Sequence, residues 1–154
     1  MPYRPFAGQN CSIARALELV GERWSLLVMR EVMLGRRRFG EIREQLGVAP
    51  NILSDRLGTL VEHGLLRHDG HGEYRLTAKG ADLHPVLIAL MRWGDRHAAP
   101  DGPPRVAVHV ACGHDAEPEY RCGHCGDVLE PGALKVRPGP GASGRQRAEP
   151  LLPS

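Results

Sequence analysis

Residues 39–66 constrain the fold of this chain more than any other stretch. They hold two helical patterns separated by a Gly-Val-Ala-Pro-Asn turn at residues 47–51. In the second pattern, four apolar residues fall at i, i+4, i+7 and i+8, which places them on one face of a helix. They are Leu53, Leu57, Leu60 and Val61. Two helices joined by a short turn that contains glycine predict a helix-turn-helix.

The opposite arc of the second helix carries mostly short polar side chains. Its members are Asn51, Asp55, Gly58, Thr59 and Glu62, with Ser54 and Arg56 on the flanks. Such an arc suits a helix in the major groove of DNA, where Asn and Arg reach base edges and hydroxyls reach phosphates. An ordinary surface helix with a solvated polar face would have the same pattern, so this helix alone leaves both interpretations open.

The residues that follow favour DNA binding. Gly64 can end the helix, a short strand starts at Leu65, and residues 69–72 have the composition of a hairpin turn. Residues 73–76 alternate like a returning strand, and Thr77 is a candidate N-cap for another helix. A helix-turn-helix followed by a hairpin predicts a winged helix. Four cationic or titratable side chains would lie on or beside this wing, where they can meet phosphates or a minor groove: Arg67, His68, His71 and Arg75.

Two helices are expected before the helix-turn-helix. Residues 1–10 predict a loosely held arm, and a helical pattern then runs from Cys11 towards a stop at Gly21. A second helix is expected at about residues 24–34. Three arginines, at positions 36–38, come directly before the helix-turn-helix. They could clamp a phosphate, because a guanidinium forks onto one, or they could form a solvated turn.

A long helix is predicted for residues 78–97, with a break or kink near residues 83–84 because of Pro85. Its apolar stripe is too wide for so small a domain to cover. A two-fold partner would cover it, with the first and last helices forming the interface. The residues expected there are Ile13, Leu17, Leu83, Leu87, Leu90 and Met91. The alternative is that the stripe packs inside its own chain.

Composition limits the setting and the remaining functions. The net charge of +2 gives no strong global basic field, so a nucleic-acid surface must come from local charge placement. No apolar run approaches the roughly 20 residues of a membrane-spanning helix. The N-terminus also lacks the apolar core of a signal peptide. We therefore expect a cytoplasmic protein that does not enter membranes, with its four cysteines acting as metal ligands or reactive thiols.

A second part of the chain is predicted beyond a linker at residues 98–106. Residues 107–136 hold His109-x2-Cys112 and Cys122-x2-Cys125, a spacing that lets two knuckles present four ligands to one tetrahedral zinc ion. His114 and His124 compete for the fourth position. The alternative is a β-ribbon that keeps the ligand spacing and holds no metal. Residues 137–154 are rich in Pro, Gly, Ser and Arg and predict a disordered tail.

The tail residues also raise two other classes of function. Cys112, His114 and Asp115 could be imagined as a catalytic group, but no nucleophile–base arrangement lies on rigid elements, so we expect no enzymatic activity. A protein-interaction adaptor is the alternative, with a degenerate winged helix and the zinc-ribbon-like extension as its contact surface.

From Cys11 to Trp93 the chain resembles the HxlR-type winged-helix transcriptional regulators, relatives of the MarR group. The matching landmarks are Cys11, Gly21-x2-Trp24-Ser-Leu-Leu, Arg30-Glu31, Arg38-Phe39, Leu53-Ser54-x-Arg56-Leu57, Gly64-Leu65, Tyr74-x-Leu76-Thr77-x-x-Gly80 and Trp93-Gly94. The cysteine-containing extension is similar to one found in a subset of the family. The chain departs from the family pattern at Ser12, where many members have proline, at Gly58, where a longer basic side chain is common, and in its short wing.

The resemblance implies a dimeric DNA-binding regulator. The second helix of its helix-turn-helix would enter the major groove, and its first and last helices would form the dimer interface. In some members of the family, the cysteine that corresponds to Cys11 senses oxidants or electrophiles, so the resemblance makes Cys11 a candidate redox sensor. A thiol at a helix N-terminus is activated by the helix dipole, and Arg15 lies one turn on. The alternative role for Cys11 is that of a small side chain at the dimer interface.

We therefore predict a mainly α-helical winged helix-turn-helix with a hairpin wing, plus a small C-terminal β-ribbon. Its expected function is that of a transcriptional regulator, a repressor that binds a near-palindromic operator as a homodimer. The half-sites would lie about one DNA turn apart, roughly 34–36 Å. The sequence identifies no small-molecule effector. The predicted DNA-binding residues are Arg38, Asn51, Ser54, Asp55, Arg56, Thr59, Arg67, His71 and Arg75.

Overall fold

The computed structural model describes residues 6–148 of the chain. The chain divides after Pro103 into two compact units, which are described separately below. In its described part the first unit contains a 3-10 helix, six α-helices and one hairpin, and the described part of the second contains one short helix. In chain order the elements are η1 (Phe6–Gly8), α1 (Ser12–Val20), α2 (Ser25–Met33), α3 (Phe39–Leu46), α4 (Pro50–Glu62), β1 (Leu66–His68), β2 (Tyr74–Leu76), α5 (Ala78–Ala81), α6 (His84–His97) and α7 (Gly144–Ala148).

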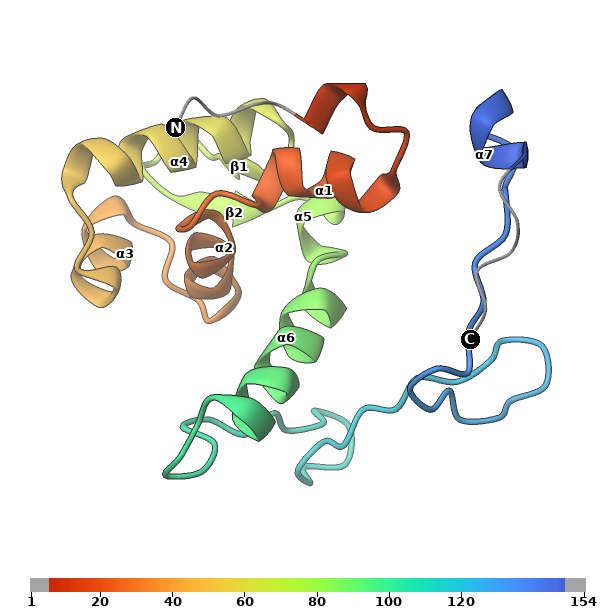
Figure 1. The fold of residues 1–154 in the computed structure, drawn as a ribbon. Coiled ribbons are helices and arrows are strands. Elements are labelled where there is room, and N and C mark those ends of the chain that lie inside the picture. The colour runs from red at the N-terminus through yellow and green to blue at the C-terminus, as the bar shows by residue number, and fades with distance from the viewer. Residues whose placement is uncertain (1–5, 149–154) are drawn as a thin grey trace. The chain divides into compact units, whose positions relative to one another are not determined.

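The helix-turn-helix is formed by α3 and α4, and it packs with α2 and the hairpin around the core of the first unit (Figure 1). Leu53, Leu57 and Leu60 are fully buried, which confirms the apolar face read from their spacing. Helix α4 starts at Pro50, inside the segment expected to be a turn. Proline is favourable there because its fixed φ suits the first turn of a helix, where an N–H would have no partner. Gly64 ends the helix with φ +69° in the left-handed region, as predicted.

The wing is a two-stranded antiparallel hairpin of β1 and β2, with Arg67 opposite Arg75. A third segment joins it. The Tyr74 N–H donates to the Arg37 carbonyl at 2.7 Å, and Arg38 forms an isolated bridge with Glu73. Arg37 and Arg38 therefore lie in extended chain beside the hairpin and not in a turn, and both are exposed to solvent.

A buried carboxylate accounts for the first of the three arginines. Glu31 on α2 is only 2% exposed. It accepts from the Arg30 guanidinium at 2.5 Å and from the Arg36 guanidinium at 2.9 Å. A buried charge is tolerated only when it is paired, so Arg36 has a structural role in holding the end of α2 in place.

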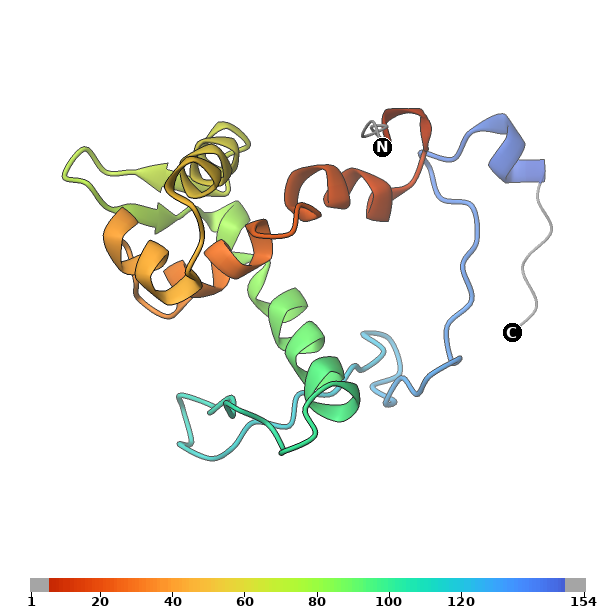
Figure 2. The same cartoon turned by 60° about the vertical axis from the view of Figure 1, so that its left-hand side comes forward.

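Helices α5 and α6 confirm the predicted break, since Pro85 lies in the first turn of α6. Helix α6 extends away from the helix-turn-helix in both views (Figures 1 and 2). None of its residues is buried, although Leu83 just before it and Leu87 within it pack against the core. No helix within residues 6–148 is long and apolar enough to span a membrane.

The second unit has little regular structure in its described part. In place of the expected β-ribbon it has two isolated bridges, Val108 with Asp115 and Arg121 with Val128. Each hairpin closes on a tight turn after one bridged pair, so no ladder develops. The tail expected to be disordered contains α7, and residues 149–154 lie outside the described residues. Ser143 and Gln146 explain α7, because the Gln146 N–H donates to Ser143 Oγ and the Ser143 N–H donates to Gln146 Oε1, a capping box.

Candidate nucleic-acid interface

The outer face of α4 carries the polar arc that the sequence predicted. Asn51, Ser54 and Asp55 are exposed in the first half of the helix. Thr59, farther along, is half-buried, and its hydroxyl donates to the Asp55 carbonyl at 2.9 Å. The short polar side chains that are exposed on this helix therefore lie near its N-terminus, the end that approaches base edges in helix-turn-helix complexes.

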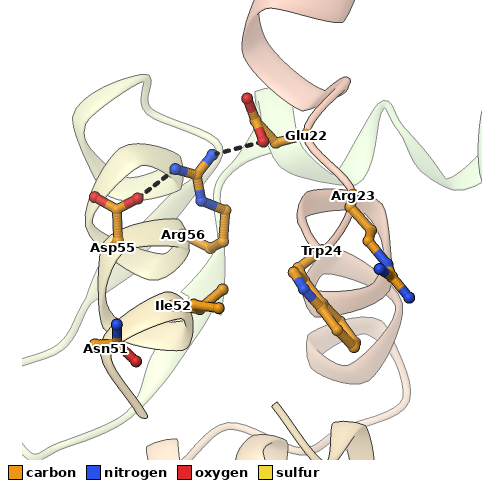
Figure 3. Close-up of a pocket in the computed structure, with 7 residues that line it drawn as sticks. All are labelled: Glu22, Arg23, Trp24, Asn51, Ile52, Asp55 and Arg56. Carbon is orange, nitrogen blue, oxygen red and sulfur yellow. Dashed lines mark hydrogen bonds and ion pairs between the residues drawn. The ribbon is translucent and has the colours of Figure 1, made fainter. Parts of the chain in front are cut away.

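Arg56 lies differently from its neighbours on α4. Its side chain is only 19% exposed and is ion-paired with Asp55 and, at 3.8 Å, with Glu22. Figure 3 shows the guanidinium between these two carboxylates, at one end of an open groove of about 420 Å³. The groove separates α4 from Arg23 and Trp24, and Asn51 and Ile52 complete its α4 side. Arg56 thus pairs with two exposed carboxylates at the edge of this groove, and its contact with Glu22 connects α4 to the segment between α1 and α2.

Asp69 organises the turn of the wing. Its carboxylate accepts from the His71 N–H at 2.9 Å, from the Glu73 N–H at 3.1 Å and from Arg75 Nε at 3.1 Å. The His71 N–H contributes most to lowering the pKa of Asp69 to about 2. The carboxylate is therefore ionised throughout the neutral range, and the turn keeps its hydrogen bonds there.

The predicted wing cations divide into paired and unpaired groups. Arg75 is held by Asp69 and by Glu73, the latter at 2.7 Å. Arg38 is 63% exposed and lies 3.6 Å from Glu73. Arg67 and the side chain of His71 are exposed, and Arg67 forms no ion pair with any residue from 6 to 148. Arg67 is thus the wing cation best placed to meet a phosphate.

Sequence reasoning did not single out Arg43, an exposed cation of the helix-turn-helix. It lies on α3, is exposed, and takes part in none of the ion pairs found within the described chain. It could have been identified from the sequence, because it is the one basic residue inside the first helix of the helix-turn-helix. At the start of the same helix, Glu41 accepts the backbone N–H groups of Arg38 and Arg37, which holds the pKa of its carboxyl below the ordinary range. This carboxylate caps α3 and fixes its orientation.

The predicted interface residues and Cys11 are mostly on the surface of the first unit. Cys11 is exposed and precedes α1 as its N-cap residue. Ile13 is 71% exposed, Leu17 41% and Leu90 51%. Met91 is half-buried. Leu83 and Leu87 pack against their own core, so that part of the stripe is covered within the chain.

The four predicted metal ligands form two pairs in the second unit. His109 Nδ1 lies 3.2 Å from Cys112 Sγ. The backbone N–H groups of Cys125 and His124 hydrogen-bond the sulfur of Cys122 and hold the pKa of its thiol below the ordinary range. Within residues 6–148 the structure gathers no three candidate ligands around one point. His114 is engaged elsewhere, with Nδ1 at 2.9 Å from the Cys112 carbonyl oxygen.

Known proteins share this architecture. The family described as HxlR-like helix-turn-helix matches residues 19–102. An uncharacterised HTH-type transcriptional regulator of Mycobacterium tuberculosis is 44% identical over 137 residues, which covers 84% of this chain and 87% of the relative.

Two solved structures extend the comparison. The crystal structure of the transcription factor PA1607 superposes with a TM-score of 0.75 at 36% identity, over 86% of this chain and 98% of that one. Quinone-bound YodB of Bacillus subtilis superposes with a TM-score of 0.51 at 31% identity, over 56% of this chain and 98% of that one. The first similarity reaches well beyond the winged helix.

Proposed function

The chain belongs to the HxlR-like helix-turn-helix family of transcriptional regulators, and from that premise we propose that it is a repressor that binds a near-palindromic DNA operator as a homodimer. The observation that carries the proposal is the exposed arc of short polar side chains on α4 beside a wing whose Arg67 forms no ion pair with any described residue. A repressor of this kind acts by occupying the operator, so it needs no catalytic group.

Helix α4 is suited to the major groove by its length and by its side chains. Its 13 residues span about 20 Å, enough to cross the groove. Asn51 can hydrogen-bond the edge of an adenine, and the Ser54 hydroxyl can reach a base or a phosphate. The exposed carboxylate of Asp55 is paired with Arg56, which offsets its repulsion from phosphates, and its other oxygen can accept from the amino group of a cytosine.

Arg67 provides the experiment for this DNA surface. Replacing Arg67 with alanine should weaken binding to all sequences alike, because a phosphate contact carries no sequence information. It should also reduce the slope of log affinity against log salt by about one unit per subunit, because binding without this contact releases fewer counterions from the DNA. Fluorescence titration of a labelled duplex at several salt concentrations measures both effects. Arg96→Ala, which removes an exposed arginine at the end of α6, is the control and should change neither. Equal slopes for parent and Arg67→Ala would remove the wing from the DNA surface.

The dimer is proposed because apolar side chains on α1 and α6 lack cover in the single chain. Ile13, Leu17, Leu90 and Trp93 are all more than 40% exposed, and α6 extends away from the core (Figure 2). Packing these helices against a second copy would bury them and place two copies of α4 on one face of the dimer. Two-fold symmetry in the protein then requires an inverted repeat in the DNA.

Leu90→Asp should dissociate the dimer. A carboxylate placed in an apolar interface loses its hydration without gaining a partner, at a cost on the order of several kcal/mol. Analytical ultracentrifugation at micromolar concentration should show a dimer for the parent and a monomer for the variant. Leu134→Asp, at a side chain 69% exposed in the second unit, should remain dimeric. A parent protein that sediments as a monomer would rule out the paired arrangement.

We further propose that Cys11 makes the repressor responsive to oxidants or electrophiles. Its thiol is exposed at the N-terminus of α1, beside the apolar residues of the proposed dimer, so a modification there would disturb the interface. YodB, a related HTH-type transcriptional regulator that is 30% identical to this chain over 92 residues, has been crystallised with quinone bound.

Treatment with a quinone should lower the affinity of the parent protein for its operator, and Cys11→Ser should abolish that response. The three remaining cysteines lie in the second unit and can also react, so Cys125→Ser serves as the comparison and should keep the response. Gel-shift titration before and after treatment gives the measurement. If Cys11→Ser still loses affinity after treatment, the signal acts at another residue.

A further inference from the structure

Two loops of the second unit share one pattern of backbone hydrogen bonds. In the first loop, Gly113 N–H donates to His109 O at 2.8 Å and His109 N–H donates to His114 O at 2.9 Å. In the second, Gly126 N–H donates to Cys122 O at 2.8 Å and Cys122 N–H donates to Asp127 O at 2.8 Å. The sequence separations are the same in both loops, four residues for the first bond and five for the second.

The match continues outside the turns. Ala116 N–H donates to Ala107 O and Leu129 N–H donates to Tyr120 O, both at 2.7 Å and both nine residues apart. The isolated bridges, Val108 with Asp115 and Arg121 with Val128, also occupy equivalent positions. Within the loops only the spacing of the ligand-type residues and the following glycine recur, as His-x2-Cys-Gly and Cys-x2-Cys-Gly. Two different sequences thus build the same short hairpin around that spacing.

In the first hairpin the two ligand-type side chains lie next to each other. His109 Nδ1 and Cys112 Sγ are 3.2 Å apart, close to the roughly 3.5 Å that separates a nitrogen and a sulfur on one tetrahedral zinc ion. In the second hairpin, the backbone N–H groups of Cys125 and His124 point at the Cys122 sulfur, an arrangement that stabilises a metal-bound thiolate. Gly113 and Gly126 have φ of +72° and +80°, so each turn closes through a backbone conformation that favours glycine.

We propose that the second unit binds one structural zinc ion through His109, Cys112, Cys122 and Cys125. Each hairpin supplies two ligands, which is half of a tetrahedral set, so the ion would be bound by both hairpins together. Four protein ligands leave no open position for a substrate. His109 is the nitrogen ligand, since its Nδ1 already lies 3.2 Å from the sulfur of Cys112, its partner in the same hairpin.

The second unit needs such an ion because it has almost no core. None of its described residues, 104–148, is buried, and its apolar side chains include Val110 at 97% exposed. A segment of this size with so little buried apolar surface gains stability from a metal when its ligands are in place.

Metal analysis of the full chain, purified without a histidine tag under reducing conditions, tests the site. We expect about one zinc per chain, lost in Cys122→Ser and reduced in His109→Ala. Cys11→Ser and His114→Ala are the matched controls and should keep the full content. Reconstitution with Co²⁺ should give the visible absorption of a tetrahedral thiolate site in the parent and in both controls, and Cys122→Ser should lose it.

Three results would overturn the proposal. The first is a fully reduced parent protein that holds no zinc after incubation with Zn²⁺. The second is zinc content that survives both Cys122→Ser and Cys125→Ser. The third is a Cys122–Cys125 disulfide in the freshly purified chain, with no zinc taken up after reduction. Circular dichroism of each variant will show whether the first unit stays folded, so that loss of metal is not confused with loss of the protein.

Discussion

Gly80→Ala should unfold the winged helix or lower its melting temperature severely. A Cβ at this position would lie 2.0 Å from the Leu65 carbonyl oxygen and 3.3 Å from Met29 Cε, and the oxygen belongs to the backbone and cannot swing aside. The close approach exists because α5 clamps the end of α4. Thr77 Oγ1 donates to the Gly64 carbonyl at 2.6 Å, and Lys79 Nζ donates to the His63 carbonyl at 2.8 Å.

We expect a loss of about 3 kcal/mol or more, which for a domain of this size corresponds to a fall of roughly 12–24 °C in Tm. Thermal melting followed by circular dichroism measures it. Gly40→Ala, in helix α3 where a Cβ would meet nothing within 4 Å, is the matched control. It should be neutral or should stabilise the domain by up to about 1 kcal/mol, because alanine is the better helix former. Similar melting temperatures for both variants would mean that α5 moves away freely and does not clamp α4.

Ser54→Glu should abolish operator binding while the protein stays folded. Ser54 is exposed on α4, and glutamate is a good helix former, so the substitution leaves the core and the helix intact. It places a carboxylate against the DNA in each subunit of the proposed dimer. Like charges facing each other across an interface cost on the order of several kcal/mol, which is about a hundredfold or more in Kd.

The control for Ser54→Glu is Ala98→Glu, which adds the same charge at the exposed C-cap of α6. It should bind within a few-fold of the parent. Both variants should melt at the parent temperature and sediment as the parent does. Binding by Ser54→Glu at parental affinity would show that α4 does not face the DNA.

Local patterns predicted the elements that position this site. Period and spacing placed Leu53, Leu57 and Leu60 in the core, and Gly64 and Pro85 marked helix boundaries correctly, because each depends only on neighbouring residues. The capping box of Ser143 and Gln146 was equally local, but the surrounding glycines and prolines led us to expect a tail without helix.

Features that depend on distant partners could not be predicted in the same way. Arg37 lies in extended chain because its carbonyl accepts from the backbone N–H of Tyr74, which is 37 positions later in the sequence. Arg56 was expected at the DNA surface, and its ion pairs with Glu22 and Asp55 could not be read from the sequence, since Glu22 lies 34 positions earlier. The apolar stripe of α6 is only partly covered by the core, since Leu87 packs inward and Leu90 is exposed. Which of these residues would be covered depends on how α6 packs, and the sequence does not show that.

Selection of DNA fragments by the purified full chain tests the central claim most directly. The chain would be mixed with a randomised pool of duplexes at physiological salt, and the retained fragments would be sequenced. We predict enrichment of an inverted repeat whose half-site centres lie about 10–10.5 base pairs apart, or a multiple of that, with no enrichment by Ser54→Glu. The absence of any enriched sequence, or the same enrichment by Ser54→Glu, would contradict operator binding through α4.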